Sequence, residues 1–133
     1  MRQLSVSTTT REEFVDITAQ VAQALAESGL ADGALLVYSP HTTAGVTINE
    51  GADPDVKRDM LAHLRELVPH NAGFHHAEGN SDAHIKTSLM GPLQLIPVSG
   101  GRMALGTWQH IYLCEFDGPR RRTVLVQTLQ AGG

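Results

Sequence analysis

The stretch LQLIPVSGGRMALGTWQHIYLCEFDGPRRRTVLVQTL, residues 93–129, decides the fold. Apolar, aromatic and β-branched residues recur in it in short runs, a composition and spacing typical of β-strands. Gly100-Gly101 separates the first two runs as a hairpin turn would, and Asp117-Gly118-Pro119 separates the last two. The predicted strands are Leu93–Val98, Arg102–Leu105, Trp108–Phe116 and Arg122–Leu129. Their short connections predict mostly antiparallel pairing.

The remainder of the chain alternates between strand and helix patterns. The expected elements are a strand at Gln3–Thr9, a helix from Asp16 to Gly29, strands at Ala34–Tyr38 and Val46–Ile48, a helix from Asp53-Pro54 to Pro69, and a short helix at His84–Met90. Residues 70–82 show neither period and predict a long loop. We therefore expect a single α+β domain over residues 1–133. In it, two main helices pack against a mostly antiparallel, β-sandwich-like sheet.

Composition excludes several classes of protein. The 133 residues are 41% hydrophobic and 18% charged, which supplies one core and argues against a disordered chain. Fourteen acidic against ten basic residues give a net charge of −4, which argues against a general nucleic-acid binder. No apolar run approaches the ~18 residues of a membrane span, and the single Cys114 fits a reducing compartment. The sequence predicts a cytoplasmic protein with neither nucleic acid nor membrane as a partner.

Three histidines are candidates for chemistry. His76 and His84 flank a glycine-containing segment, and two imidazoles on such a segment can converge on one cation. A catalytic zinc site uses three protein ligands, so His41, or a carboxylate such as Glu50 or Asp82, could complete it. The spacing matches none of the fixed metal-binding motifs. The alternative is that these histidines cap helices and hydrogen-bond the loop.

Further residues could bind a substrate or move a proton. Gly106-Thr107-Trp108-Gln109 combines a flat indole with hydrogen-bonding groups and suits a heteroaromatic ring, although a lone Trp also commonly anchors a core. Lys86 and the triplet Arg120-Arg121-Arg122 could hold a phosphate, although charges beside a turn are commonly just solvated. Asn49-Glu50 precedes the second helix, where Glu50 is either a general base or a favourable charge at the helix N-terminus. The standard nucleotide-binding and serine-hydrolase motifs are absent from the sequence.

Taken in chain order, these segments match one family. They are His41-Thr42-Thr43-Ala44, Asn49-Glu50, Asp53, Asp59, Phe74-His75-His76, Asn80-Ser81-Asp82-Ala83-His84-Ile85-Lys86, Gly106-Thr107-Trp108-Gln109 and Arg122. The chain resembles the YjbQ-like family of uncharacterised proteins, whose members are often labelled secondary thiamine-phosphate synthase. The resemblance covers nearly the whole chain and implies an α+β sandwich-like domain that assembles as a homotrimer.

The resemblance also implies a polar site. The family's polar residues fall on His41, Asn49, His76, His84, Trp108-Gln109 and, in the same neighbourhood, Arg122. Some of the histidines would bind a metal such as zinc. The loop between His76 and His84 is shorter here than in many relatives, which leaves the third metal ligand open.

Three functions follow as hypotheses. The first is a weak thiamine-phosphate-synthase-like transferase that joins a pyrimidine pyrophosphate to a thiazole phosphate, with magnesium assisting the leaving group. The second is a zinc-dependent hydrolase of a small phosphorylated molecule. The third is a non-catalytic trimeric module that binds an anion or a metal. The assigned residues are His41, Asn49 and Glu50 as catalytic; Lys86, Thr107, Trp108, Gln109 and Arg122 as substrate-binding; and His41, His76 and His84 as metal-binding.

Overall fold

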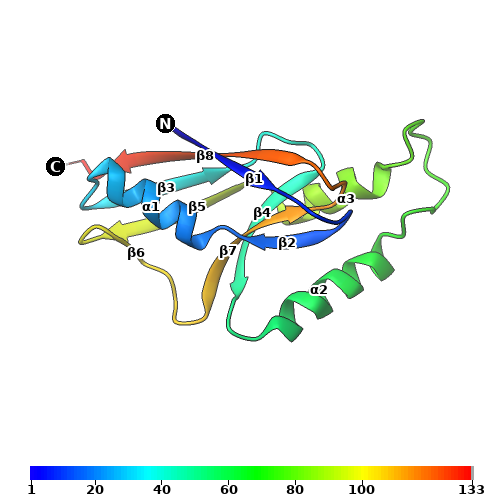
Figure 1. Ribbon diagram of the computed structural model, residues 1–133, viewed down its shortest axis with the longest axis horizontal. Helices are drawn as coiled ribbons and strands as arrows, with labels where there is room; N and C mark the ends of the chain where they lie inside the picture. The colour runs from blue at the N-terminus through cyan, green and yellow to red at the C-terminus, as the bar shows by residue number, and fades with distance from the viewer. Residues whose placement is uncertain (133) are drawn as a thin grey trace.

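Two antiparallel sheets form the frame of the computed structural model, which describes residues 1–132 (Figure 1). The larger sheet has the strand order β1–β8–β3–β5–β6 and the smaller one β2–β7–β4. The strands of the larger sheet are β1 (Arg2–Ser7), β3 (Gly33–Tyr38), β5 (Leu93–Ser99), β6 (Arg102–Met103) and β8 (Arg121–Gln130). Those of the smaller sheet are β2 (Glu13–Asp16), β4 (Ala44–Glu50) and β7 (Gln109–Glu115). The predicted α+β class and antiparallel pairing are confirmed.

Strand β2 is the one element that the sequence pattern misses. It pairs with β7 from Glu13 opposite Glu115 to Asp16 opposite Tyr112. Four residues are too few for an alternation of apolar and polar side chains to be recognised. Its place in the sheet is therefore set by the pairing with β7 rather than by its own pattern.

Three helices accompany the sheets, namely α1 (Thr18–Ser28), α2 (Pro54–Leu67) and α3 (Ser81–Met90). As predicted, α2 begins with Pro54 at its first position and Asp53 as its cap, whose Oδ1 accepts a hydrogen bond from the Asp55 N–H at 2.9 Å. Helix α1 ends at Gly29, whose φ of 73° favours a residue without a side chain. Helix α3 begins three residues before the predicted short helix at His84 and is a third helix beside the two main ones.

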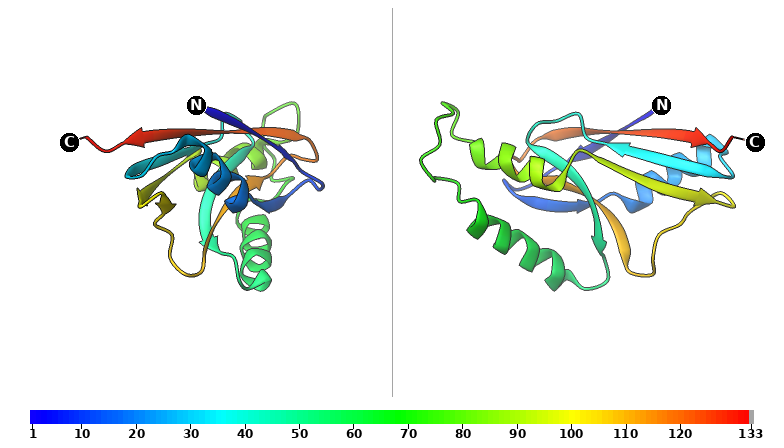
Figure 2. Two further views of the ribbon diagram at one scale, coloured as in Figure 1. Left: turned by 60° about the vertical axis from the view of Figure 1, so that its left-hand side comes forward. Right: turned by 180° about the vertical axis from the view of Figure 1, so that it is seen from behind.

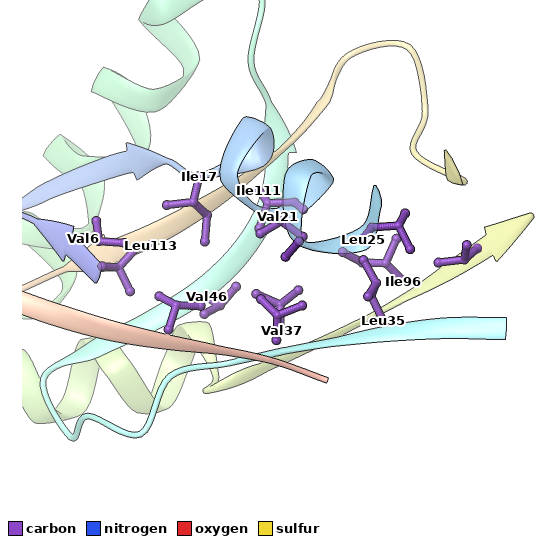
Figure 3. Packing of buried hydrophobic residues seen from close by; sticks show 14 of the residues in the cluster. Val6, Ile17, Val21, Leu25, Leu35, Val37, Val46, Ile96, Ile111 and Leu113 are labelled. Atoms are coloured by element: carbon purple, nitrogen blue, oxygen red, sulfur yellow. The ribbon is translucent and has the colours of Figure 1, made fainter. Parts of the chain in front are cut away.

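The main core lies between α1 and the two sheets (Figure 3). Ile17 and Val21 from the start of α1 meet Leu35 and Val37 of β3 and Leu113 of β7, and all five are completely buried. Each such side chain stabilises the fold by about 1.5–3 kcal/mol. This core fixes β4 and β7 against the larger sheet, and so fixes the positions of the polar groups at their ends.

A second apolar cluster lies beneath α2 and α3. Phe14 of β2 packs against Tyr112 and Phe116 with ring centroids 6.0 and 6.4 Å apart, and Leu64 of α2 and Ala83 of α3 belong to the same cluster. The connection between α2 and α3 lies at the end of the molecule opposite the C-terminus (Figures 1 and 2). The cluster thereby holds α3 beside the start of β4.

Strand β4 also bridges the two sheets. The Val46 N–H donates to the carbonyl oxygen of Gly91 at 3.0 Å, and Gln94 Nε2 donates to the carbonyl oxygen of Val46 at 3.0 Å. These two hydrogen bonds therefore tie the smaller sheet to β5 and its preceding turn beside the larger sheet. Within residues 1–132, every helix is too short or too polar to cross a membrane.

Candidate functional site

The ladder of β4 and β7 divides the predicted site residues into two groups. Ala44 pairs with Glu115 at one end of the ladder, and Glu50 pairs with Gln109 at the other. Six residue steps of extended chain separate the ends by about 20 Å. The histidines belong to the first end and Trp108 belongs to the second, so one small molecule cannot touch both within a single chain.

A polar hollow of about 280 Å³ lies at the first end. We call it the histidine hollow, and its lining is Thr42, Thr43, His76, Glu78, Asn80, His84, Asp117 and Arg120. The rings of His76 and His84 meet edge to face, with centroids 5.4 Å apart and an interplanar angle of 87°. His76 comes from the loop before α3 and His84 from the first turns of α3, so the helix start brings the pair together.

Asp117 is hydrogen-bonded to two other residues that line the hollow, Asn80 and Arg120. Its carboxylate accepts hydrogen bonds from Arg120 Nη2 at 3.2 Å and from Asn80 Nδ2 at 2.8 Å, and its backbone carbonyl accepts from Arg120 Nε at 2.9 Å. The Asn80 Oδ1 atom is buried without a hydrogen-bond partner. The side chain of Arg120 is half exposed, so its guanidinium faces both Asp117 and the solvent of the hollow.

His41 lies outside the hollow, and its imidazole is hydrogen-bonded to the backbone of β8. Its Nε2 accepts a hydrogen bond from the Thr123 N–H at 2.9 Å, which requires the other ring nitrogen to carry the proton in the neutral ring. Burial, followed by the nearby guanidinium of Arg122, lowers the pKa of His41, so the neutral ring is favoured at pH 7. His41 is not among the residues that line the histidine hollow.

The predicted zinc site needs a third ligand. Within residues 1–132, no three His, Cys, Asp or Glu side chains are placed so that together they could hold a metal ion. His76 and His84 supply two imidazoles, but the Nε2 of His41 is already bonded to the backbone. The arrangement of residues does not fit the three-ligand site, and the divalent metal stays a prediction.

Lys86, assigned to the substrate, faces inward from α3. Its Nζ donates to Glu12 Oε2 at 2.8 Å and to Asp82 Oδ2 at 3.1 Å, and the residue is only 1% exposed. Arg11 completes the cluster with two hydrogen bonds of 3.0 and 3.1 Å to Asp82. Burial alone would raise the pKa of Asp82, but the bonds from Arg11 and Lys86 hold that pKa below its ordinary value.

Arg122, the second assigned cation, is also buried. Its guanidinium forms a two-pronged ion pair with the fully buried Glu115 and donates to Thr43 Oγ1 at 2.8 Å. Glu115 in turn accepts a hydrogen bond from Thr8 Oγ1 at 2.8 Å. The ion pair therefore joins β8, β7 and the loop after His41, so that it supports the wall of the hollow from behind.

We call the second end of the ladder the tryptophan corner, which contains Asn49, Glu50, Thr107, Trp108 and Gln109. Its polar side chains bond to nearby backbone. Glu50 Oε2 accepts from the Ala52 N–H at 2.8 Å, Gln109 Oε1 from the Gly106 N–H at 2.8 Å, and Asn49 Oδ1 from the Glu50 N–H at 2.7 Å. Trp108 is 61% exposed, so the lone Trp does not anchor the core.

Beside the tryptophan corner lies a His–Asp pair that the sequence analysis misses. His110 Nδ1 and Asp16 Oδ2 are 2.6 Å apart, and Asp16 Oδ1 also accepts from the N–H and the hydroxyl of Thr18 at 3.0 and 2.7 Å. Burial would raise the pKa of Asp16, but the bonds from Thr18 and His110 lower it overall. The only signal in the sequence was a histidine next to Trp108-Gln109. Its partner lies 94 residues away, beyond the reach of spacing arguments.

Known proteins of similar sequence carry one family description. The family model described as "UPF0047 protein YjbQ-like" matches residues 2–131. The UPF0047 protein YugU of Bacillus subtilis is 51% identical over 130 residues, which cover 97% of this chain and 98% of the relative. The UPF0047 protein MJ1081 of Methanocaldococcus jannaschii is 53% identical over 124 residues, or 93% and 90% of the two chains.

Solved structures agree with the sequence comparison. A crystal structure of an uncharacterised YjbQ/UPF0047 protein from Clostridium acetobutylicum has a TM-score of 0.95 and 51% identity, and the match covers 97% of this chain and all of that one. A hypothetical protein from Aeropyrum pernix gives a TM-score of 0.94 at 39% identity, with 98% of both chains covered. The names of these proteins state no reaction.

Proposed function

The chain belongs to the YjbQ-like UPF0047 family, as its motifs predicted, and on that premise we propose that it is a small-molecule enzyme whose phosphorylated substrate binds in the histidine hollow. The observation that carries the proposal is the convergence of two imidazoles and one half-exposed guanidinium on a single hollow. Arginine binds phosphate through charge-assisted hydrogen bonds, and Arg120 is the cation that lines this hollow.

The imidazole pair supports hydrolysis of a phosphoester. Histidine is the side chain that most readily gives or takes a proton near neutral pH. In the proposed reaction one ring removes a proton from water as its oxygen bonds to phosphorus, and the other protonates the departing alcohol oxygen as its bond to phosphorus breaks. The 5.4 Å separation of the ring centroids of His76 and His84 supports this assignment, because one phosphate group can contact two rings that close together.

The geometry gives less support to the transferase that the resemblance implies. That reaction would use Trp108 to stack the pyrimidine and Lys86 and Arg122 to bind the phosphates. Trp108 is about 20 Å along the ladder from the hollow, and both cations are buried in ion pairs with carboxylates. The zinc-dependent form of hydrolysis, the homotrimer and the cytoplasmic location stay predictions, and no step is assigned to a metal.

Calorimetric titration with inorganic phosphate tests the binding half of the proposal. We expect His84→Ala and Arg120→Ala each to weaken phosphate binding by about 10- to 100-fold, since each removes one charge-assisted contact. His63→Ala is the matched control, because His63 is an exposed histidine of α2 outside the hollow. Equal affinities in all four proteins would contradict the proposal.

The chemical half is tested with p-nitrophenyl phosphate as a general phosphoester. Tag-free protein with its metal content measured by elemental mass spectrometry should release p-nitrophenol from this substrate. The release should be at least about 100-fold slower in His84→Ala and unchanged in His63→Ala. If the protein carries about one zinc per chain, the zinc-dependent hydrolase takes the place of the metal-free reaction. If phosphate binds but no p-nitrophenol is released, the protein is a binding module and not an enzyme of this kind.

A further inference from the structure

A second hollow adjoins the histidine hollow and has the opposite character. It has a volume of about 510 Å³, and we call it the phenylalanine hollow. Its lining includes Phe74, His75, His76, Ser81, His84 and Ile85. His76 and His84 line both hollows, so the imidazole pair belongs to both. Within residues 1–132, the lining of the phenylalanine hollow contains no Asp, Glu, Lys or Arg, whereas Glu78, Asp117 and Arg120 line the histidine hollow.

Helix α3 supplies one wall of the phenylalanine hollow. Ser81, His84 and Ile85 are spaced three and four residues apart, so they share one face of the helix. The next residue, Lys86, points inward to its carboxylate partners, whereas Ile85 is 38% exposed. The buried ion cluster therefore leaves an aliphatic side chain beside the imidazole of His84.

The loop before α3 supplies the other wall. His70 Nε2 donates a hydrogen bond to the carbonyl oxygen of Gly79 at 2.8 Å, and the Gly79 N–H donates to the carbonyl oxygen of His76 at 3.2 Å. These bonds tie together the two sides of the loop that contains Phe74. The Phe74 side chain is 38% exposed and, in the described part of the chain, lies outside both apolar clusters of the core. The loop thus presents part of an aromatic ring to the hollow.

The two hollows together suit a molecule with two unlike parts. A phosphate group fits beside Arg120, because arginine binds phosphate through charge-assisted hydrogen bonds. An aromatic ring fits beside Phe74 and Ile85, because aromatic pairs are stabilised beyond the burial of their area. An enclosed cavity of roughly 150 Å³ holds benzene, so a hollow of about 510 Å³ has room for a ring of that size.

We propose that the substrate is the phosphate monoester of a phenol or another aromatic alcohol, with its phosphate in the histidine hollow and its ring in the phenylalanine hollow. This inference rests on the proposed phosphoester hydrolysis. In phosphoryl transfer the attacking and leaving oxygens lie roughly in line on opposite sides of phosphorus. Water therefore attacks from the histidine hollow, and the bond from phosphorus to the ester oxygen breaks towards the phenylalanine hollow.

The reaction balances with water as the other reactant. One imidazole takes the proton of the attacking water, and the other gives its proton to the departing ester oxygen. The products are inorganic phosphate and the aromatic alcohol. Phe74 and Ile85 select the substrate through its ring and take no part in the breaking of bonds.

Calorimetric titration with two phosphonates tests the inference on the untagged full chain. Phenylphosphonate and methylphosphonate share one headgroup and differ in the organic group, and they have no ester bond to hydrolyse, so the titration measures binding alone. The wild type should bind phenylphosphonate at least about 10-fold more tightly than methylphosphonate, because only the phenyl ring contacts Phe74. Phe74→Ala should lose most of that preference and keep its affinity for methylphosphonate. Ile85→Ala should lose a smaller part of the preference.

Two variants are matched controls. Leu67→Ala removes an apolar side chain that is 61% exposed on α2, and Trp108→Ala removes the exposed indole at the tryptophan corner. Both should keep the preference of the wild type, because neither residue lines the phenylalanine hollow. Circular dichroism checks that each variant is folded, and Phe74→Ala is expected to fold because its side chain lies outside the core clusters.

The outcomes separate this inference from the proposed function. Equal affinities of the wild type for the two phosphonates overturn the inference, while the phosphate site of the proposed function stands. A preference that survives Phe74→Ala also overturns it, and loss of the preference in Trp108→Ala would place the ring at the tryptophan corner instead. If the wild type binds neither phosphonate, the proposed phosphate site fails and the inference fails with it.

Discussion

The two ends of the β4–β7 ladder are built from different kinds of contacts. At the histidine end, hydrogen bonds join residues distant in sequence: Lys86 to Glu12 over 74 residues, and His41 to Thr123 over 82. At the tryptophan corner, the side chains of Asn49, Glu50 and Gln109 bond to backbone one to three residues away. The polar side chains of the first end are therefore positioned by the whole fold, whereas those of the second end are held mostly by local turns.

The difference is tested most strongly by Lys86→Ala. This change leaves the buried carboxylate of Asp82 and that of Glu12 with one cation fewer, and such a loss typically costs about 3–5 kcal/mol. Urea denaturation measured by circular dichroism should show that loss in the free energy of unfolding. Arg58→Ala, which removes an exposed ion pair with Asp55, is the control and should cost less than about 1 kcal/mol. Similar losses in both variants would mean that the buried cluster contributes no more than a surface pair.

The pH dependence of stability should come largely from the histidine end. Because the folded pKa of Asp82 lies below its unfolded value, the stability it contributes is complete above the ordinary carboxyl pKa of about 4. That contribution is lost as the pH falls through the lower, folded pKa. Denaturation curves between about pH 6 and 2 should therefore be steeper for the wild type than for Asp82→Asn. Parallel curves would assign the acid sensitivity to other carboxylates.

A smaller loss is expected beside the tryptophan corner from Asp16→Ala. The substitution removes the hydrogen bonds to Thr18 at the start of α1 and the contact with His110. Loss of a hydrogen bond of this kind typically costs about 1 kcal/mol. Thermal unfolding of this variant can be compared with Asp59→Ala, an exposed position on α2. A loss of several kcal/mol would show that the His–Asp pair is as central as the buried cluster.

The smallest effect is expected for Trp108→Ala. Because the indole is 61% exposed, its removal should change the free energy of unfolding by about 0.5 kcal/mol or less. Phosphate affinity at the histidine hollow should also be unchanged, since the corner lies about 20 Å away along the ladder. A clear loss of affinity would break the separation of the two ends and indicate that they meet in the assembled protein.

The same contrast explains which parts of the fold were predictable. Hydrophobic periodicity and turn residues locate seven of the eight strands found in residues 1–132, because alternation in segments such as β8 is long enough to recognise. Asp53-Pro54 marks the start of α2 for a local reason as well. Strand β2 was missed because its position depends on β7, about a hundred residues later. Local signals were visible in the sequence, and pairing between distant segments was not.

The candidate site follows the same rule. His76 and His84 were singled out from their loop, and the structure brings their rings together. The ion pairs of Lys86 with Glu12 and of Arg122 with Glu115 were not predicted. Glu12 is 74 residues from Lys86, and Glu115 lies on a different strand from Arg122, so no spacing rule connects either pair. A lysine on a short helix normally faces water. Its burial here goes together with the exposure of Ile85 and Leu89 elsewhere on α3.

The exposure of Trp108 has a practical consequence for spectroscopy. It is the only indole in the chain, and it already stands mostly in solvent in the folded protein. Its fluorescence should therefore change little when the core melts, and an unfolding curve followed by emission would understate the transition. For the same reason, a blue shift of the Trp108 emission in the folded protein would show that a molecule has bound at the tryptophan corner.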